Sequence, residues 1–231
     1  MTAAATWIEA TASALAPLAC APNATAMRSY MKDVAPFLGV TTPERRRAER
    51  SAWSGLAPLD PAGVSDVALA LWALPEREYH YAACDLIGRH ARVLPGGFVA
   101  DPVQDLLTDK PWWDTVDSLG STAVTPIVAH HPHLVDLMWS WLDSGDRWLI
   151  RAAIQHQRGL KEQTDVARLI AMCDRFAADR EFFIAKAIGW ALRDVTRWDP
   201  AAVRRFVDDH PDLSPVARRE AVRGLDRQSR P

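Results

Sequence analysis

The sequence lacks the features that would place it in a membrane or an oxidising compartment. Its three cysteines, Cys20, Cys84 and Cys173, lie far apart and form no C-x-x-C pair, which argues against a disulfide framework or a structural zinc site and favours a reducing compartment. No apolar run approaches the length of a membrane span, and the first 20 residues contain no Lys or Arg, unlike a signal peptide. We therefore expect a cytoplasmic protein with no membrane partner.

Motifs for several common enzyme classes are also missing. There is no glycine-rich phosphate-binding loop and no G-x-S-x-G nucleophile elbow. The nearest approach to a metal site is His130-His131-Pro132-His133, but adjacent histidines before a proline are typical of a loop, and no cysteine or H-x-x-x-H helix accompanies them. The sequence predicts no metal site and no cofactor.

Lysine is scarce, with 4 residues against 23 arginines, and the net charge of −2 is unevenly distributed. Residues 1–50 carry +2, residues 51–146 carry −9 and residues 147–231 carry +5. Basic flanks can still hold DNA if they line one surface, because phosphate binding depends on local potential. Codon bias is an alternative explanation of the arginine excess.

Strand signals are nearly absent, and the chain of 231 residues consists of successive helical patterns. The expected helices cover 24–32, a segment from Thr42 as N-cap, Pro61 to about Ala73, Glu76–His90 with Tyr79, Ala83, Leu86 and Ile87 as its apolar face, 132–142, 147–157, 165–176, 180–195, and segments starting at Pro200 and Pro215. Their spacing is near that of HEAT-like units, so we predict an all-α helical repeat solenoid (an α-α superhelix) in preference to a compact bundle. No long linker interrupts it, which predicts a single domain over residues 1–231.

The segment from Lys110 to Asp117 contains two adjacent indoles followed by two carboxylates. Pro111 suits the first turn of a helix, so Trp112 onward is expected to be helical. Trp113 and Asp117 are then four residues apart on one face, where a carboxylate beside an indole can stabilise a positive charge. The alternative is structural, since paired tryptophans are common in cores and a helical Asp is commonly solvated or a cap.

Several segments carry a family resemblance in the same order along the chain. They are Tyr30-Met31-Lys32 with Phe37 to Arg46, Arg77 to Ala83, Trp112 to Asp117, Trp148 to Ile154 and Glu181 to Arg193. Together they resemble the bacterial DNA alkylation repair family of AlkD-like glycosylases, from about Met27 to Arg219. The resemblance implies a HEAT-like solenoid with a concave DNA-binding face, and a monomeric enzyme that removes cationic N3- or N7-alkylated purines from duplex DNA.

The resemblance also assigns roles to individual residues. The catalytic carboxylate of the family falls on Asp117, and its two sugar-facing indoles fall on Trp113 and Trp190. Its DNA-contacting arginine at the lesion falls on Arg151. Further DNA-contacting positions fall on Tyr30, Lys32 and Arg193.

The residues themselves leave other readings open. Trp190 has Lys186 and Asp194 one turn away on either side, so its face is mixed, which favours a surface role. Arg151 could simply be solvated on an apolar helix. Ile150 departs from the family, whose members often have a second Arg there, and the acidic middle of the chain would weaken nonspecific DNA binding. Because relatives without glycosylase activity exist, a HEAT-like module that binds DNA or protein without chemistry is the alternative function.

Overall fold

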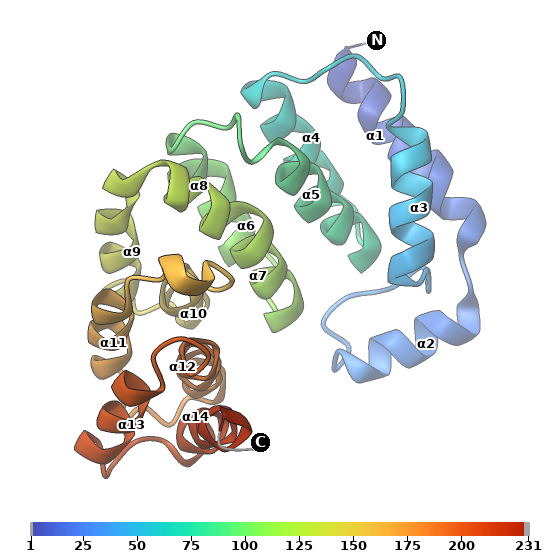
Figure 1. The fold of residues 1–231 in the computed structure, drawn as a ribbon. Coiled ribbons are helices and arrows are strands. Elements are labelled where there is room, and N and C mark those ends of the chain that lie inside the picture. The colour runs from blue at the N-terminus through green and yellow to red at the C-terminus, as the bar shows by residue number, and fades with distance from the viewer. Residues whose placement is uncertain (1, 229–231) are drawn as a thin grey trace. The chain divides into compact units, whose positions relative to one another are not determined.

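A computed structural model describes residues 2–228 of the chain. In that range helices joined by turns and loops make up the structure, and there is no strand. The all-α prediction is confirmed (Figure 1). The α-helices are α1 (Ala3–Leu15), α2 (Ala21–Tyr30), α3 (Thr42–Ala52), α4 (Pro61–Ala73), α5 (Arg77–His90), α6 (Gln104–Thr108), α7 (Trp113–Leu119), α8 (Thr125–His130), α9 (Val135–Leu142), α10 (Arg147–Gln155), α11 (Val166–Asp174), α12 (Phe182–Val195), α13 (Pro200–Asp209) and α14 (Pro215–Gln228). Within the described range, no helix combines the length and apolar character that a membrane crossing requires.

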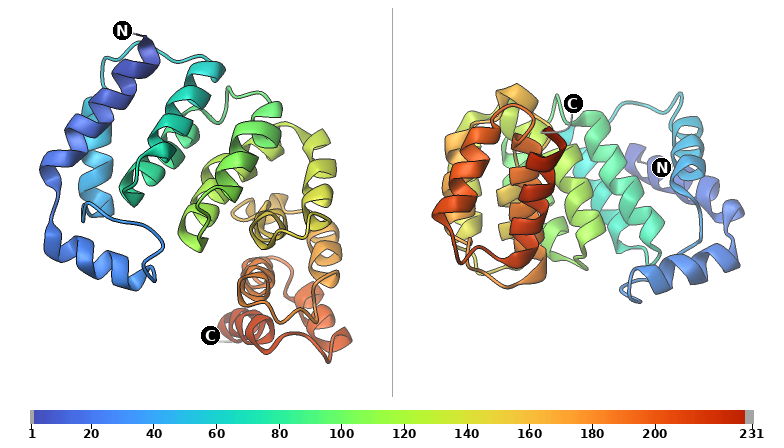
Figure 2. Two further views of the ribbon diagram at one scale, coloured as in Figure 1. Left: turned by 180° about the vertical axis from the view of Figure 1, so that it is seen from behind. Right: turned by 60° about the horizontal axis from the view of Figure 1, so that its bottom comes forward.

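The helices form two compact units, which divide after Ala123. In the first unit α1 packs against α3 and α4, α4 against α5, and α5 against α7. In the second unit α9 packs against α10, α10 against α12, and α12 against α14. Figures 1 and 2 show α4 and α5 side by side in every view. Helices packed on their neighbours along the chain are consistent with a helical repeat. The single domain and the concave face stay predictions.

The core of the first unit follows the predicted helical pattern. The apolar face expected on α5 is buried, with Ala83, Leu86 and Ile87 fully inaccessible and Tyr79 6% exposed. Burying one such large apolar side chain stabilises a fold by about 1.5–3 kcal/mol. The spacing of apolar residues in the sequence therefore identified the face of α5 that is buried in the core.

The start of α4 agrees with the sequence prediction, whereas the start of α3 differs from it. The helix α4 begins at Pro61 as predicted and is capped by Asp60, because the Asp60 carboxylate accepts the Gly63 N–H at 2.8 Å. The N-cap of α3 is Thr41 and not Thr42, since the Glu44 carboxylate reaches back to the Thr41 N–H at 3.2 Å and to its hydroxyl at 2.5 Å. This reciprocal capping box outweighs the proline signal that favoured Thr42.

Two glycines allow α12 and α14 to approach closely in the second unit. A Cβ on Gly189 would lie 2.7 Å from the Cβ of Glu220, and one on Gly224 would lie 2.6 Å from the Thr196 hydroxyl oxygen. Carbon atoms do not approach so closely without displacement of the backbone. These glycines therefore set the spacing of the helix pair that carries Trp190.

Candidate functional site

The segment with paired indoles and carboxylates begins its helix later than predicted. Pro111 precedes the helix, and Trp112 is an extended N-cap residue with φ −152° and ψ 161°. The helical part starts at Trp113, so Trp113 and Asp117 are one turn apart, as predicted, and both are half-buried. A π-helical turn at Gly120–Val124 follows directly, a type of distortion that is frequent at functional sites.

The structure brings two predicted site residues of the first unit into contact. The rings of Tyr30, from the end of α2, and Trp113, from the start of α7, meet edge to face with centroids 6.3 Å apart and planes at 80°. Tyr30 is 70% exposed, and the helix that carries it, α2, has no buried residue. Lys32 follows in an exposed turn with φ 62°. The pair presents an aromatic surface to solvent.

A buried carboxylate that sequence reasoning missed fixes the connection after α2. Glu78, only 1% exposed, accepts the backbone N–H groups of Leu38, Gly39 and Val40 at 2.9, 2.8 and 3.0 Å. Gly39 has φ 87°, and a Cβ there would meet the carbonyl oxygen of Cys20 at 2.1 Å. The connection is thus anchored to α5 at three consecutive amides, which limits where Tyr30 can lie.

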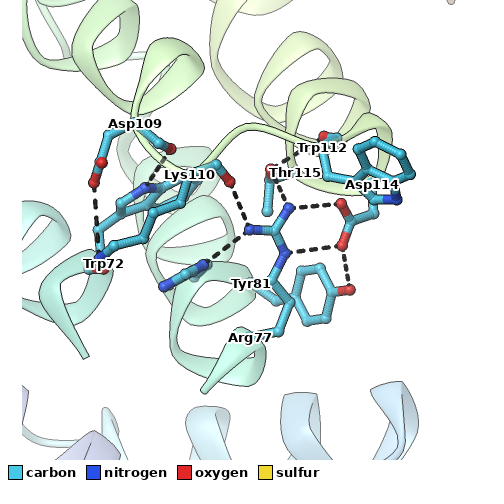
Figure 3. Close-up of polar contacts among 9 residues, drawn as sticks. Trp72, Arg77, Tyr81, Asp109, Lys110, Trp112, Asp114 and Thr115 are labelled. Atoms are coloured by element: carbon cyan, nitrogen blue, oxygen red, sulfur yellow. Dashed lines mark hydrogen bonds and ion pairs between the residues drawn. The ribbon is translucent and has the colours of Figure 1, made fainter. Parts of the chain in front are cut away.

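Asp114, the other carboxylate of the segment, is committed to structure. Arg77 grips it through two hydrogen bonds, Nε to Oδ2 at 3.0 Å and Nη2 to Oδ1 at 2.7 Å, and the Tyr81 hydroxyl donates to Oδ2 at 2.5 Å (Figure 3). Burial acts to raise the pKa of Asp114, but the Arg77 hydrogen bonds and charge outweigh it and hold that pKa below its usual value. Asp114 therefore stays ionised and is engaged by Arg77 and Tyr81. The catalytic role of Asp117 stays a prediction.

The remaining donors of Arg77 anchor the loop before α7. Its Nη1 donates to the Lys110 carbonyl at 2.9 Å and lies 3.1 Å from His80 Nδ1, while Nη2 also reaches the Thr115 hydroxyl at 2.8 Å. The imidazole of His80 stacks on Trp72 at 4.8 Å, and burial lowers its pKa to about 4. A neutral imidazole can accept from the guanidinium, so the network is satisfied (Figure 3). It holds the start of α7 against α4 and α5.

Trp190 in the second unit is surrounded by cations. Arg151, Arg158, Lys186 and Arg193 place their charged groups 5.2, 5.0, 5.7 and 6.0 Å from the centroid of its ring. The indole is half-buried, in agreement with the mixed face expected from its neighbours in sequence. Such a concentration of positive charge favours an anionic partner such as a phosphate.

The four cations are held in different ways. Arg151 is not solvated: it is 1% exposed, and its Nη1 donates to the Phe183 carbonyl at 2.7 Å. Arg193 and Lys186 share one buried carboxylate, Glu220, at 2.6 and 2.8 Å. Burial acts to raise the pKa of Glu220, but these cations lower it overall, so the group is ionised. The DNA contacts expected of Arg151 and Arg193 stay predictions.

The predicted residues fall into two groups by unit. Tyr30, Lys32, Trp113 and Asp117 belong to the first unit, and Arg151, Trp190 and Arg193 belong to the second. Sequence reasoning did not single out Glu78, Arg77 or Arg158, because an isolated charge gives no signal of its partner. In residues 2–228 no cluster of three or more His, Cys, Asp or Glu side chains could hold a metal ion.

A cavity of about 310 Å³ lies beside Tyr30 in the first unit. Its walls come from α2, α3, α5 and α7 and include Arg45, Tyr81, Asp114 and Ser118. Neither Trp113 nor Asp117 lines it. The candidate catalytic carboxylate therefore does not face this cavity.

Comparison with known proteins identifies relatives of the whole fold. A family model described as DNA alkylation repair enzyme matches residues 11–225. A solved structure from Enterococcus faecalis, titled a predicted DNA alkylation repair enzyme, superposes with a TM-score of 0.79 at 29% sequence identity, covering 87% of this chain and 93% of that one. No curated protein matches the chain.

Proposed function

The chain belongs to the DNA alkylation repair enzyme family, and on that premise we propose that it is a DNA glycosylase. Its substrates are purines alkylated at N3 or N7 in duplex DNA, and its reaction is hydrolysis of the N-glycosidic bond. The observation that carries the proposal is that the two carboxylates of α7 have different surroundings. Asp114 is bound by Arg77 and Tyr81, while Asp117 lies half-buried beside Trp113.

Hydrolysis of this N-glycosidic bond needs one correctly positioned carboxylate. An N3- or N7-alkylpurine is already cationic, so the bonding electrons of C1′–N pass to the base without protonation by a general acid. Positive charge then develops on the deoxyribose, where the Asp117 carboxylate stabilises it. The same carboxylate orients a water molecule whose oxygen bonds to C1′ and whose proton passes to the carboxylate or to solvent.

Aromatic faces complete the environment of the sugar. Trp113 supplies an indole one turn before Asp117, with Tyr30 against its edge, and Trp190 is assigned the second face. This route works from the backbone side and needs no pocket for an extruded base, in contrast to most glycosylases. Bulky adducts would then be substrates as well as small methyl groups.

The partner is duplex DNA containing alkylated purines. Arg151, Arg193, Tyr30 and Lys32 are proposed to contact the DNA, and the cations around Trp190 support an anionic ligand there. The protein is proposed to act as a monomer in the cytoplasm without a cofactor. Cys20, Cys84 and Cys173 are free thiols, which fits a reducing compartment.

The decisive experiment is excision from duplex DNA that carries N7-methylguanine or a bulky N3-adenine adduct. Asp117→Asn keeps the size of the side chain and one acceptor oxygen but removes the charge, and should slow excision by about 10²-fold or more. Trp113→Leu should lose less, because an indole contributes polarisability and not a full charge. DNA binding by both variants should stay near the parent level.

The matched control is Asp105→Asn, which removes an exposed carboxylate from α6 in the same unit. It should excise at the parent rate. Equal rates for Asp117→Asn and the parent would remove Asp117 from the mechanism. A parent that excises nothing from any cationic lesion would leave the alternative function, a HEAT-like module that binds without chemistry.

A further inference from the structure

A second cavity in the second unit, of about 200 Å³, opens beside Trp190. It is lined by Arg158, Trp190, Arg193, Asp194, Thr196, Arg197 and Gly224. Three guanidinium groups and one carboxylate around a space of this size make a polar, positively charged site. We propose that it holds one phosphodiester of the DNA strand, with Arg158 and Arg197 as its ligands.

The charge of the site resides on the two arginines that no carboxylate neutralises. Arg193 is already paired with Glu220 at 2.6 Å. Among the side chains that the structure describes, Arg158 bonds only the neutral amide oxygen of Gln155, at 3.2 Å, and the Arg197 guanidinium has no hydrogen-bond or ion-pair partner. Both residues are exposed, so an anion can reach them. A phosphate oxygen pair matches the planar fork of a guanidinium.

The acidic member of the cavity, Asp194, offsets one of the three positive charges, and the arginines stay in excess. The Asp194 carboxylate accepts the backbone N–H of Gly159 at 3.2 Å, in the turn that follows Arg158. It thereby ties the turn after α10 to α12 and holds Arg158 at the mouth of the cavity. Asp194 acts here as a support for the site and not as a ligand.

Gly224 lets α14 approach closely enough to form one side of the cavity. A Cβ at this position would meet Thr196 Oγ1 at 2.6 Å and Arg193 Cγ at 3.1 Å. Thr196 cannot easily turn away, since its hydroxyl donates to the Arg193 carbonyl at 2.7 Å. The backbone of α14 at Gly224 therefore packs directly against Thr196 and Arg193 beside the cavity.

The surroundings of Trp190 explain why an anion belongs in this place. Four cations of the protein lie within 6.0 Å of the centroid of the Trp190 ring. Their charge repels a further cation, including one that develops on the deoxyribose. A phosphate between Arg158 and Arg197 compensates that field and draws the Arg158 guanidinium toward itself. The inference rests on the proposed function for the role of Trp190, whereas the phosphate site itself is tested by binding alone.

Binding of undamaged duplex DNA is measured against salt concentration for the parent, Arg158→Ala, Arg197→Ala and the double variant. Each lost phosphate contact should reduce the slope of log K against log[salt] by about 0.9. Because both arginines are needed to hold the same phosphate, the slope of the double variant should fall little further than that of either single variant. Arg205→Ala removes an exposed arginine from α13 outside the cavity and should leave the slope unchanged. Arg158→Lys should keep the slope while weakening affinity, since charge remains but the fork is lost.

Unchanged slopes in Arg158→Ala and Arg197→Ala would overturn the site, as would equal losses in Arg205→Ala or a parent that binds no duplex DNA. Excision of N7-methylguanine separates this outcome from failure of the proposed function. With saturating enzyme, Arg205→Ala should excise N7-methylguanine at the parent rate, since this exposed arginine of α13 lies outside the cavity. A parent without excision whose slopes still fall in both variants would retain the phosphate site and refute the glycosylase.

Discussion

Asp114 and Asp117 lie three residues apart on α7, and we expect their substitutions to have different effects. Substitution of Asp114 should lower stability, whereas substitution of Asp117 should lower the excision rate. Asp114→Asn leaves Arg77, which is fully buried, without its anionic partner. The new amide nitrogen is a donor facing either the Arg77 fork or the Tyr81 hydroxyl, both of which need an acceptor at this place. The loss is therefore larger than that of a single hydrogen bond.

Removing one partner of a buried ion pair costs about 3–5 kcal/mol, because the other charge stays buried without compensation. For a chain of this size each kcal/mol shifts the melting temperature by about 2–4 °C, so Asp114→Asn should melt roughly 6–20 °C below the parent. Asp117→Asn, on the half-buried face of the same helix, should melt close to the parent. Thermal unfolding followed by circular dichroism measures both.

A double variant separates loss of the ion pair from general damage. Arg77→Met with Asp114→Leu removes both charges and fills their space, and such replacements are often neutral or stabilising. It should melt above Asp114→Asn. If Asp114→Asn instead melted like the parent and abolished excision, the assignment of a structural role to Asp114 and a catalytic role to Asp117 would be wrong.

Two further predictions concern solution conditions. Burial lowers the pKa of His80 and His156 to about 4, below the usual value near 6.5, so their contribution to stability is full above pH 6.5 and is lost as the pH falls toward 4. Burial raises the pKa of Glu49 to about 7, so the folded state gains stability from this group as the pH falls from 7 to 4.5. The two histidines outweigh this one carboxyl, and denaturant unfolding should show a net loss of stability from pH 6.5 to 4. The loss should be smaller in His156→Gln. Excision should be fully retained in EDTA, and a loss that added zinc or magnesium restores would contradict the metal-free mechanism.

Local pattern was sufficient to predict what is local in this molecule. The start of α4 at Pro61, the buried face of α5 and the one-turn relation of Trp113 to Asp117 follow from helical periodicity and from the preference of proline for the first turn of a helix. The predicted start of α7 was one residue early, because the proline signal is also satisfied just outside a helix, where Trp112 stays extended. The family followed from motifs in a fixed order, which the match over residues 11–225 confirms.

Side-chain partners were decided by tertiary structure alone. Arg77 and Asp114 are 37 residues apart, and nothing in either sequence neighbourhood indicates that the pair is buried or that it removes Asp114 from the candidates for chemistry. Arg151 could equally have been solvated until its helix was seen packed against α12. A charge has no periodicity that reveals its partner, since pairing depends on which helix faces meet and on how deeply they exclude water. The sequence therefore determined the helices and the family, whereas the packing of those helices decided that Arg77 binds Asp114 and where positive charge gathers around Trp190.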